Sequence, residues 1–291
     1  MNQKSKWQYV VLFVGPAMLI YILIFLLPTV ILIATSFTSW NGGDLPKFIG
    51  IRNYIGLTKD DAFLVALWNT VKMGLLAAFV HVPLGALLAL ILYRKPRGWK
   101  LLRAVSLIPD IISSSVKAVM FVFIFNPGIG LLNGFIRIFD KSFNVNWFFN
   151  GKTAFLTVTL TWMFQFGLVL LIILGELLSL PDSYRESAQI DGATNWQIDW
   201  HINLPMLRQT IGACMILLVS GMFKYFEQIY LTTAGGPGYS TTTLALLIYQ
   251  NMTNSFQYGY GNTIGVVLMF LGLISIFLIQ HSPHMSSSAA D

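Results

Sequence analysis

The stretch ESAQIDGATNWQIDWHINLP, residues 186–205, is a polar segment between two long apolar segments. In the whole chain of 291 residues, 55% are hydrophobic, 10% are charged, and the mean hydropathy is +0.68. Because a soluble domain carries about 25% charged residues, this composition predicts an integral membrane protein. A connector between two spans of such a protein needs only a few residues, so a polar stretch of this length predicts a folded element with its own role.

The first half of this polar region carries the start and stop signals of a short helix. Ser183 and Glu186 fit a capping box, in which a serine and a glutamate three residues later satisfy free backbone N–H groups. The helix is expected to run to Asp191. Gly192 follows, and glycine is the residue that most easily takes the left-handed conformation that ends a helix.

The second half carries the signals of another helix. The segment TNWQ, residues 194–197, fits a second capping box. This helix is expected to run to about Leu204, where Pro205 breaks it before the next apolar segment. Residues 181–205 would therefore form a bent helix–turn–helix between two spans, so a force on this unit would move both spans.

Six apolar segments are long enough to cross a membrane, since a helix spans about 30 Å of hydrocarbon with about 20 residues. The sequence therefore predicts an all-α integral membrane protein with one transmembrane domain over residues 1–291. The first span is expected to be retained, because its apolar run is too long for a signal peptide. The predicted spans are residues 9–35, 68–93, 104–125, 153–175, 209–231 and 260–280.

The distribution of basic residues predicts the orientation of these spans. The connector between the second and third spans holds five basic residues and no acidic one, and such loops stay in the cytoplasm. An even number of spans then places both termini inside the cell, with loops at about 36–67, 126–152 and 232–259 outside. The five residues are Arg94, Lys95, Arg97, Lys100 and Arg103.

Several classes of function have no support in the sequence. The single cysteine, Cys214, excludes an intramolecular disulfide, and no Cys/His spacing typical of a metal site is present. The loop AGGPG, residues 234–238, lacks the lysine of a phosphate-binding loop, so ATP hydrolysis by that route is excluded. Basic residues do not gather in one stripe, which argues against nucleic-acid binding. We expect no catalytic residue, metal site or cofactor in this chain.

The polar region resembles the cytoplasmic motif E-A-A-x-x-x-G…I-x-L-P of ABC importer permeases. Glu186, Ala188 and Gly192 match its first half, and Ser187 replaces the second alanine. Residues 202–205, INLP, match its second half. Further stretches resemble the first permease subunit of the branch that transports maltose and glycerol 3-phosphate: residues 15–37, 48–57, 66–71, 180–188 and 231–250.

This resemblance implies a MetI-like permease fold of the type I importers and a set of partners. These are a second homologous permease, two ATP-binding cassette subunits that bind ATP and Mg²⁺, and an extracytoplasmic sugar-binding protein. It also implies residence in the cytoplasmic membrane of a bacterium or archaeon. In this family residues 181–205 would be the coupling helices that contact the ATPase. The contact residues would be Glu186, Ser187, Ala188, Asp191, Gly192 and Ala193.

A route for a sugar is expected on the fourth and fifth spans, because the polar region lies between them. Aromatic rings stack on sugars, and amides bond their hydroxyl groups. Such side chains occur in both spans, and the resemblance to maltose-type permeases adds Leu218 as a pocket position. The candidates are Trp162, Phe164, Gln165, Leu218, Gly221, Met222, Lys224, Tyr225 and Glu227.

The charged residues inside the predicted spans leave more than one interpretation open. Lys224 and Glu227 are three residues apart, so they would share a helix face, either as a structural ion pair or along the solute path. Lys117 and His81 are interpreted as packing or partner-helix contacts, and Asp110 is placed near the cytoplasmic end of its span.

The sequence predicts import of a sugar or oligosaccharide, and two alternatives remain open. One is the same scaffold with glycerol 3-phosphate, an anionic sugar or another small solute, which Lys72, Lys117 and Lys224 would favour if they faced the cavity. The other is a secondary transporter or a membrane enzyme. Against this alternative, the spans show no inverted repeat, no chain of acidic residues and no catalytic constellation.

Overall fold

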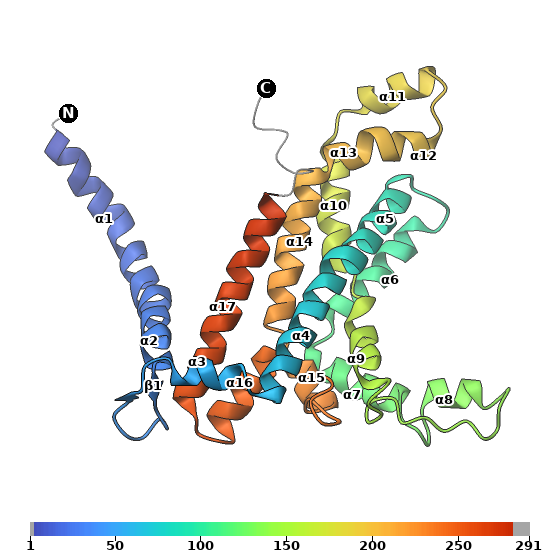
Figure 1. Cartoon of the computed structure of the whole chain (residues 1–291). Coiled ribbons are helices and arrows are strands. Elements are labelled where there is room, and N and C mark those ends of the chain that lie inside the picture. The colour runs from blue at the N-terminus through green and yellow to red at the C-terminus, as the bar shows by residue number, and fades with distance from the viewer. Residues whose placement is uncertain (1–2, 282–291) are drawn as a thin grey trace. The chain divides into compact units, whose positions relative to one another are not determined.

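The computed structural model describes residues 3–281, with side chains from residue 12 onward, and most of them are helical (Figure 1). The only strands in this part of the chain are β1 and β2, which pair antiparallel with Thr38 opposite Phe48. The elements are α1 (Gln3–Tyr21), η1 (Ile22–Leu26), α2 (Leu27–Ser36), β1 (Thr38–Ser39), β2 (Lys47–Phe48), α3 (Arg52–Leu57), α4 (Asp61–Leu76), η2 (Ala77–His81), α5 (Val82–Tyr93), α6 (Trp99–Ile111), α7 (Ser114–Ile124), α8 (Leu131–Ile136), α9 (Ala154–Met163), α10 (Gly167–Ser179), α11 (Asp182–Ile190), α12 (Asn195–Ile198), η3 (Asp199–Asn203), α13 (Leu204–Met206), α14 (Arg208–Phe223), α15 (Glu227–Thr232), α16 (Leu244–Thr253) and α17 (Tyr258–Gln280).

Four helical segments of the described chain are long and apolar enough to cross a membrane by themselves. They correspond to the first, second, fourth and sixth predicted spans, and the predicted all-α membrane fold is confirmed. Two further pairs of helices pass the same test only if each bent pair counts as one span, and they lie where the third and fifth spans were expected. The four continuous segments are Leu12–Ser36, Asp61–Tyr93, Ala154–Ser179 and Tyr258–Gln280.

The third predicted span, residues 104–125, is not one straight helix. It is formed by α6 and α7, which meet at an angle of 102°. Ile112 is extended, and Ser113 starts the new helix by accepting a hydrogen bond from the N–H of Val116 at 3.4 Å. Pro109 already weakens the end of α6, because it lacks an N–H group. The Pro-Asp-Ile-Ile-Ser sequence therefore favours a break over a continuous span.

The fifth predicted span, residues 209–231, is shorter than expected. Helix α14 ends at Phe223, and α15 begins only at Glu227. On the other side, α14 is bent by 67° from the helical segment Asn195–Met206, with Leu207 at the bend. Averaged over the length of a span, the sequence stays apolar through the break at residues 224–226 despite Lys224, so hydropathy alone did not reveal the break.

The contacts divide the chain into two compact units. The first unit comprises the described parts of Met1–Phe63 together with Leu247–Met269. Within it, the end of α2 is held by polar contacts to α3 and α17. Ser36 Oγ lies 2.8 Å from the hydroxyl of Tyr54, and Asn262 donates to Thr35 Oγ1 at 2.7 Å. These bonds satisfy polar groups where the first span ends.

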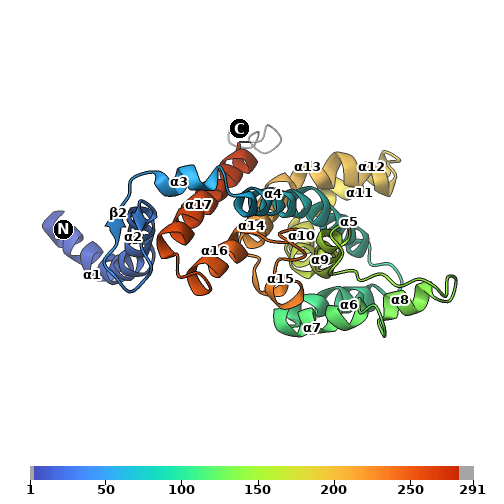
Figure 2. The same cartoon turned by 60° about the horizontal axis from the view of Figure 1, so that its bottom comes forward.

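The second unit comprises Leu64–Leu246 with the described part of Phe270–Asp291, and it contains all the elements of the candidate site. Its apolar core lies between α5, α10 and α14, and α10 also contacts α6 (Figure 2). Helices α5 and α10 approach closely at Gly85, where an added Cβ would lie 2.7 Å from Val169. Glycine at this position lets the two backbones pack tightly, as is usual between membrane helices.

Candidate functional site

Two polar regions stand out in the second unit. One is the helical hairpin of residues 181–206, formed by α11, α12, η3 and α13, which we call the polar hairpin (Figure 1). The other is a cluster at the points where three membrane helices break, which we call the break cluster. It is formed by Asp110, Ser115, Lys117, Gln165 and Glu227.

The first helix of the polar hairpin ends in a rigid turn. Gly192 has a φ of +81°, so the predicted left-handed position is confirmed. The N–H of Ala193 donates to the carbonyl of Ala188 at 2.9 Å, and the N–H of Gly192 donates to that of Gln189 at 3.1 Å. This pair of bonds is a Schellman motif, which uses the last free carbonyls of the helix to fix the direction of the chain.

The caps of the hairpin agree with the sequence at one helix and differ at the other. The capping box of Thr194 and Gln197 is present at the start of α12, as predicted. The capping box expected from Ser183 was wrong, because α11 already begins at Asp182, with Pro181 as an N-cap that makes no side-chain bond. The fixed φ of the proline starts the helix two residues earlier than the serine would.

The break expected at Pro205 is present, but it is displaced along the chain. A π-helical turn, η3, precedes α13, and Pro205 lies in that short helix without ending it. The chain bends two residues later, at Leu207. The polar hairpin therefore continues almost directly into α14.

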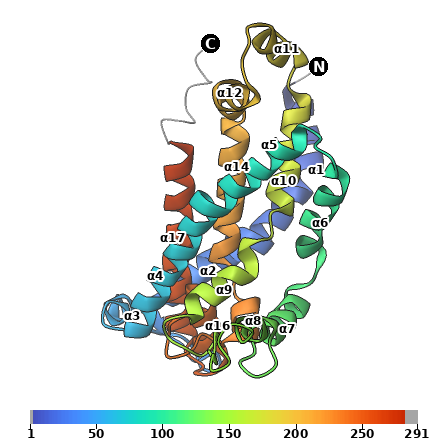
Figure 3. The ribbon, with the colours of Figure 1, turned by 90° about the vertical axis from the view of Figure 1, so that its right-hand side faces the viewer.

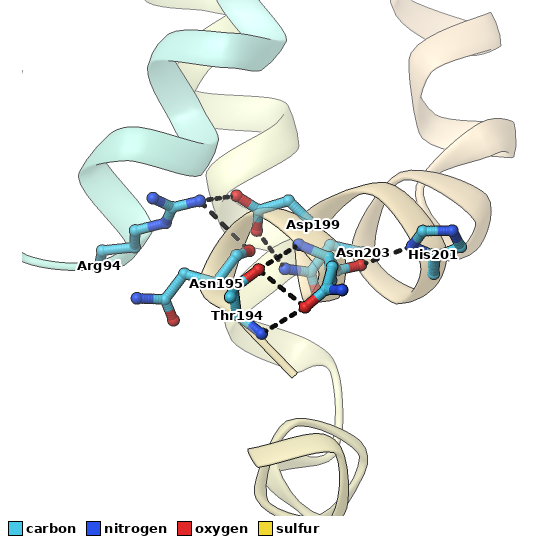
Figure 4. Close-up of polar contacts among 7 residues, drawn as sticks. Arg94, Thr194, Asn195, Asp199, His201 and Asn203 are labelled. Carbon is cyan, nitrogen blue, oxygen red and sulfur yellow. Dashed lines mark hydrogen bonds and ion pairs between the residues drawn. The ribbon is translucent and has the colours of Figure 1, made fainter. Parts of the chain in front are cut away.

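An ion pair between an exposed arginine and a buried aspartate ties the polar hairpin to the end of α5 (Figure 4). Arg94 donates to Asp199 Oδ2 and to the carbonyl of Asn195, the latter at 3.4 Å. Asp199 is only 5% exposed, and its other oxygen accepts from Asn203 Nδ2 at 2.7 Å. A buried carboxylate needs such partners. Sequence reasoning used Arg94 only for orientation and missed this contact, because its two residues are far apart in the chain.

The predicted coupling residues lie on the outer part of the hairpin. Glu186, Ser187, Asp191 and Gly192 are exposed, whereas Ala188 and Ala193 are half-buried. Large apolar side chains are exposed on the same hairpin, and sequence reasoning missed them although they interrupt a polar segment. Ile190 is 86% exposed, and the rings of Trp196 and Trp200 stack with centroids 5.9 Å apart. Exposed apolar side chains of this size are typical of a contact surface.

The break cluster joins three broken helices by side-chain bonds. Asp110, near the end of α6, accepts from the N–H of Gly167 at 2.9 Å, at the start of α10. Lys117 Nζ on α7 donates to Gln165 Oε1 at 2.7 Å. Ser115 donates to Glu227 Oε1 at 2.6 Å, at the start of α15. Irregular backbone in a membrane protein is tolerated where it is buried in protein or lines a polar cavity.

Gly167 is required at this junction. A Cβ at this position would lie 2.5 Å from Asp110 Oδ2 and 3.0 Å from Leu107. We therefore expect Gly167→Ala to lower the free energy of unfolding by about 1–3 kcal/mol, the usual cost of overpacking. Gly175→Ala on the same helix is the control, since nothing lies within 4 Å of a Cβ there. Thermal unfolding of both variants in detergent would measure the difference, and equal midpoints would contradict it.

Three of the predicted path residues lie near one another at the breaks. Gln165 stands in the break between α9 and α10, and its Nε2 donates to the carbonyl of Thr161 at 2.9 Å. The rings of Trp162 and Tyr225 meet at 6.5 Å between centroids. The ring of His81 stacks on Trp162 with centroids 5.8 Å apart and contacts the ring of Phe166 at a tilt, with centroids 5.1 Å apart. The expected packing role of His81 agrees with these contacts.

The other predicted path residues are spread over the apolar core, the exposed surface and the breaks. Leu218 packs against the apolar core, Met222 is half-buried, and Phe164, Gly221 and Lys224 are exposed. Of the two interpretations left open for Lys224 and Glu227, the structural ion pair was wrong. No such ion pair occurs within residues 12–281, because α14 ends before Lys224 and Glu227 begins a separate helix. Glu227 is bonded to Ser115 instead.

Several buried polar atoms near the break cluster lack a partner of normal geometry. They are Nε1 of Trp162, Nε2 of Gln228 and both ring nitrogens of His81. The hydroxyl of Tyr225 donates to the Oε1 of Gln228. The amide nitrogen of the same glutamine has no hydrogen-bond partner among the described residues. A buried polar group without a partner costs about 1–3 kcal/mol. These groups therefore add hydrogen-bonding capacity beside the breaks.

No cluster of metal-ligating side chains forms in the part of the chain that the structure describes. The loop that contains AGGPG, residues 234–238, is held to α4. Asn69 Nδ2 lies 3.0 Å from the carbonyls of Ser240 and Thr242, and the N–H of Leu244 donates to Thr70 at 2.9 Å. This loop lies at the end of the second unit opposite the polar hairpin (Figure 3).

Comparison with known proteins gives one matching family. Residues 81–282 match the family described as "Binding-protein-dependent transport system inner membrane component". The multiple sugar-binding transport system permease protein MsmF of Streptococcus mutans is 31% identical over 85% of this chain and 86% of its own. The sn-glycerol-3-phosphate transport system permease protein UgpA of Salmonella choleraesuis is 30% identical over 93% of this chain and 92% of its own.

A solved structure shows the same fold. It is a bacterial alginate ABC transporter in complex with an alginate pentasaccharide-bound periplasmic protein. One of its chains superposes with a TM-score of 0.82 at 22% identity, covering 96% of this chain and 95% of that chain.

Proposed function

Because this chain belongs to the family of binding-protein-dependent transport system inner membrane components, we propose that it is a membrane-spanning subunit of an ATP-driven importer for a sugar or oligosaccharide. It would act in the cytoplasmic membrane of a bacterium or archaeon, with both termini in the cytoplasm. A second permease would complete the path, two ATPase subunits would supply energy, and a binding protein outside would deliver the solute. Its multiple-sugar and alginate relatives support a carbohydrate.

The polar hairpin carries this proposal. Its first helix ends in a Schellman turn, its second helix is capped, and Arg94 ties it to α5. Such a unit is stiff, and it continues through Leu207 into α14, so a push on its exposed face would be transmitted to α5 and α14. Closure of the ATPases on ATP is proposed to supply that push. Coupling of this kind needs an element that can take two positions. The ATPase and the solute site must each favour one of these positions over the other.

The break cluster is proposed to line the solute path. Three helices end or begin there, so backbone groups and side chains can face a solute at one depth of the membrane, as in the broken helices of other transporters. Gln165, Tyr225 and Gln228 offer amide and hydroxyl groups, and Trp162 offers a ring face. This combination suits a polyhydroxylated solute.

The charges favour a neutral solute over an anionic one. Lys117 is 7% exposed and is bonded to Gln165, and the carboxylates of Asp110 and Glu227 are close enough to attract its charge. Lys72 lies against the ring of Phe155, with Nζ 4.2 Å from the centroid. One ammonium facing two carboxylates leaves no surplus of positive charge in the cluster. Glycerol 3-phosphate or an anionic sugar remains the second candidate, since UgpA is a relative.

Copurification tests this proposal. The chain would be purified from its native membrane by a C-terminal affinity tag, and the copurifying proteins would be identified by mass spectrometry. A second permease and an ATPase should be present. Neutral oligosaccharides should then stimulate ATP hydrolysis in the presence of the binding protein, whereas stimulation only by anionic solutes would favour the second candidate. Purification without any ATPase would contradict the proposed function.

Removal of the amide of Gln165 is expected to reduce solute uptake by at least about tenfold. Gln165→Leu leaves the ammonium of Lys117 without its hydrogen-bond partner, a loss of about 1.5–3 kcal/mol for a charged group. Leu168→Ile, at an exposed position at the start of α10 and outside the predicted path residues, is the control. Uptake into proteoliposomes that contain the whole transporter is the measurement.

A double variant separates a solute contact from a structural bond. Replacing both partners, Lys117→Met with Gln165→Leu, removes the unpaired charge and is expected to restore stability. Uptake should remain low if these side chains contact the solute. Recovery of normal uptake in the double variant would show that the pair is only structural.

A further inference from the structure

A lateral groove of about 510 Å³ opens in the second unit, and it begins beside the end of the polar hairpin. It is bounded by α4 with η2, by α14 and by the C-terminal part of α17, which runs beside α14 (Figure 3). Its lining is apolar except for Arg208 and Ser275, and the hydroxyl of Ser275 is bonded to the carbonyl of Leu271. Typical lining side chains are Val71, Phe79, Met215 and Leu278.

Arg208 is the only charged residue of the groove and begins α14, next to the polar hairpin. Among the side chains of residues 12–281, none forms an ion pair or a hydrogen bond with it; the ion pair of this region is that of Arg94 with Asp199. A cation at the end of a membrane helix is stabilised by an anion at the membrane surface. The groove therefore has one cationic end and an apolar length.

The dimensions of the groove suit a single acyl chain. From Arg208 to Phe223, both in the lining, α14 rises about 22 Å at 1.5 Å per residue. The hydrocarbon of one leaflet is only about 15 Å deep, half of a 30 Å core, so the groove is long enough for the whole of one acyl chain. A transmembrane helix about 10 Å wide and 30 Å long would fill a volume on the order of 2,000 Å³. The volume of the groove is about a quarter of this, so the groove is too small for a helix.

We propose that this groove binds one anionic glycerophospholipid, with its phosphate at the guanidinium of Arg208 and an acyl chain between α4, α14 and α17. The guanidinium donates two parallel hydrogen bonds to phosphate oxygens, which a neutral surface cannot match. The apolar walls replace contacts with bulk lipid and hold the chain in one place. The lipid would contact both α14 and α17. It would therefore fill the space beside α14, the helix that follows the polar hairpin.

Native mass spectrometry tests this site on the assembled transporter in nanodiscs of phosphatidylglycerol and phosphatidylcholine. The wild-type protein should retain phosphatidylglycerol in preference to phosphatidylcholine, and Arg208→Gln should weaken that retention by roughly tenfold, the loss of a charge-assisted hydrogen bond. Arg97→Gln is the control, because Arg97 is an exposed cation outside the groove. Ser275→Phe, which fills the groove and leaves the charge in place, should reduce retention as well.

The position of the lipid is read from a phosphatidylglycerol with a photoreactive acyl chain. Crosslinks on Met215 or Leu278, lost in the Ser275→Phe variant, would support the proposal. Equal retention of the two lipids, or equal retention by Arg208→Gln and wild type, would overturn it. Crosslinks of the groove residues to a partner permease and none to lipid would overturn it too, since a protein helix would then occupy the groove.

Discussion

Replacing Gly192 by proline is expected to abolish solute-stimulated ATP hydrolysis. Gly192 has a φ of +81°, whereas proline fixes φ near −65°, and its missing N–H would remove the bond to Gln189. Proline in an incompatible position costs about 3 kcal/mol or more. Since about 1.4 kcal/mol is tenfold in rate, stimulated hydrolysis should fall by roughly a hundredfold, to its basal level.

A matched control lies in the same hairpin. Asp182 occupies the first turn of α11 and follows Pro181, whose backbone is extended with ψ 127°. Proline is tolerated at the first helical position, and the extended preceding residue meets its other requirement. Asp182→Pro should therefore keep most of the stimulated ATPase activity. Normal stimulation in Gly192→Pro would show that the shape of this turn does not matter for coupling.

Breaking the ion pair between Arg94 and Asp199 is expected to have the second largest effect. Arg94→Gln should lower stimulated ATP hydrolysis by about tenfold, because the hairpin would lose its link to α5. The cost in stability should be smaller than the 3–5 kcal/mol typical of a buried pair, since Arg94 is 39% exposed and its charge can be solvated. Uptake should fall in parallel.

A double-mutant cycle distinguishes this link from two independent effects. Asp199→Asn keeps a side chain that can bond Asn203 and loses the charge that Arg94 contacts. The double variant should be no worse than Arg94→Gln alone, because both changes remove the same interaction. Arg97→Gln serves as the control for loss of a basic residue from the same loop. Additive losses in the cycle would contradict the assignment.

The features that the sequence predicted well depend on neighbouring residues. Four spans follow from long apolar runs, the turn at Gly192 follows from a glycine after a helix, and the cap of α12 needs only Thr194 and Gln197. In each case the deciding interaction lies within a few residues of chain. The same logic failed at Ser183, because the proline two positions earlier competes with it for the start of the helix.

The features that could not be predicted depend on contacts between distant segments. The break at residues 164–166 is held by Asp110 on α6 and by Lys117 on α7, about fifty residues away. The break after Phe223 separates Lys224 from Glu227, whose partner Ser115 lies on another helix. Hydropathy does not reveal such breaks, since it averages over the length of a span and the few polar residues at a break do not lower that average enough. The roles of the coupling and path residues stay predictions.

The contact between the polar hairpin and an ATPase is tested most directly by photocrosslinking. A photoreactive amino acid would replace Ile190, which is 86% exposed on the hairpin, in the whole transporter in its native membrane. The control position is Ile129, which is 78% exposed just before α8, at the opposite end of the second unit. The account predicts a crosslink from position 190 to the ATPase subunit, dependent on nucleotide, and none from position 129. A crosslink to the ATPase from position 129, or to the binding protein from position 190, would contradict it.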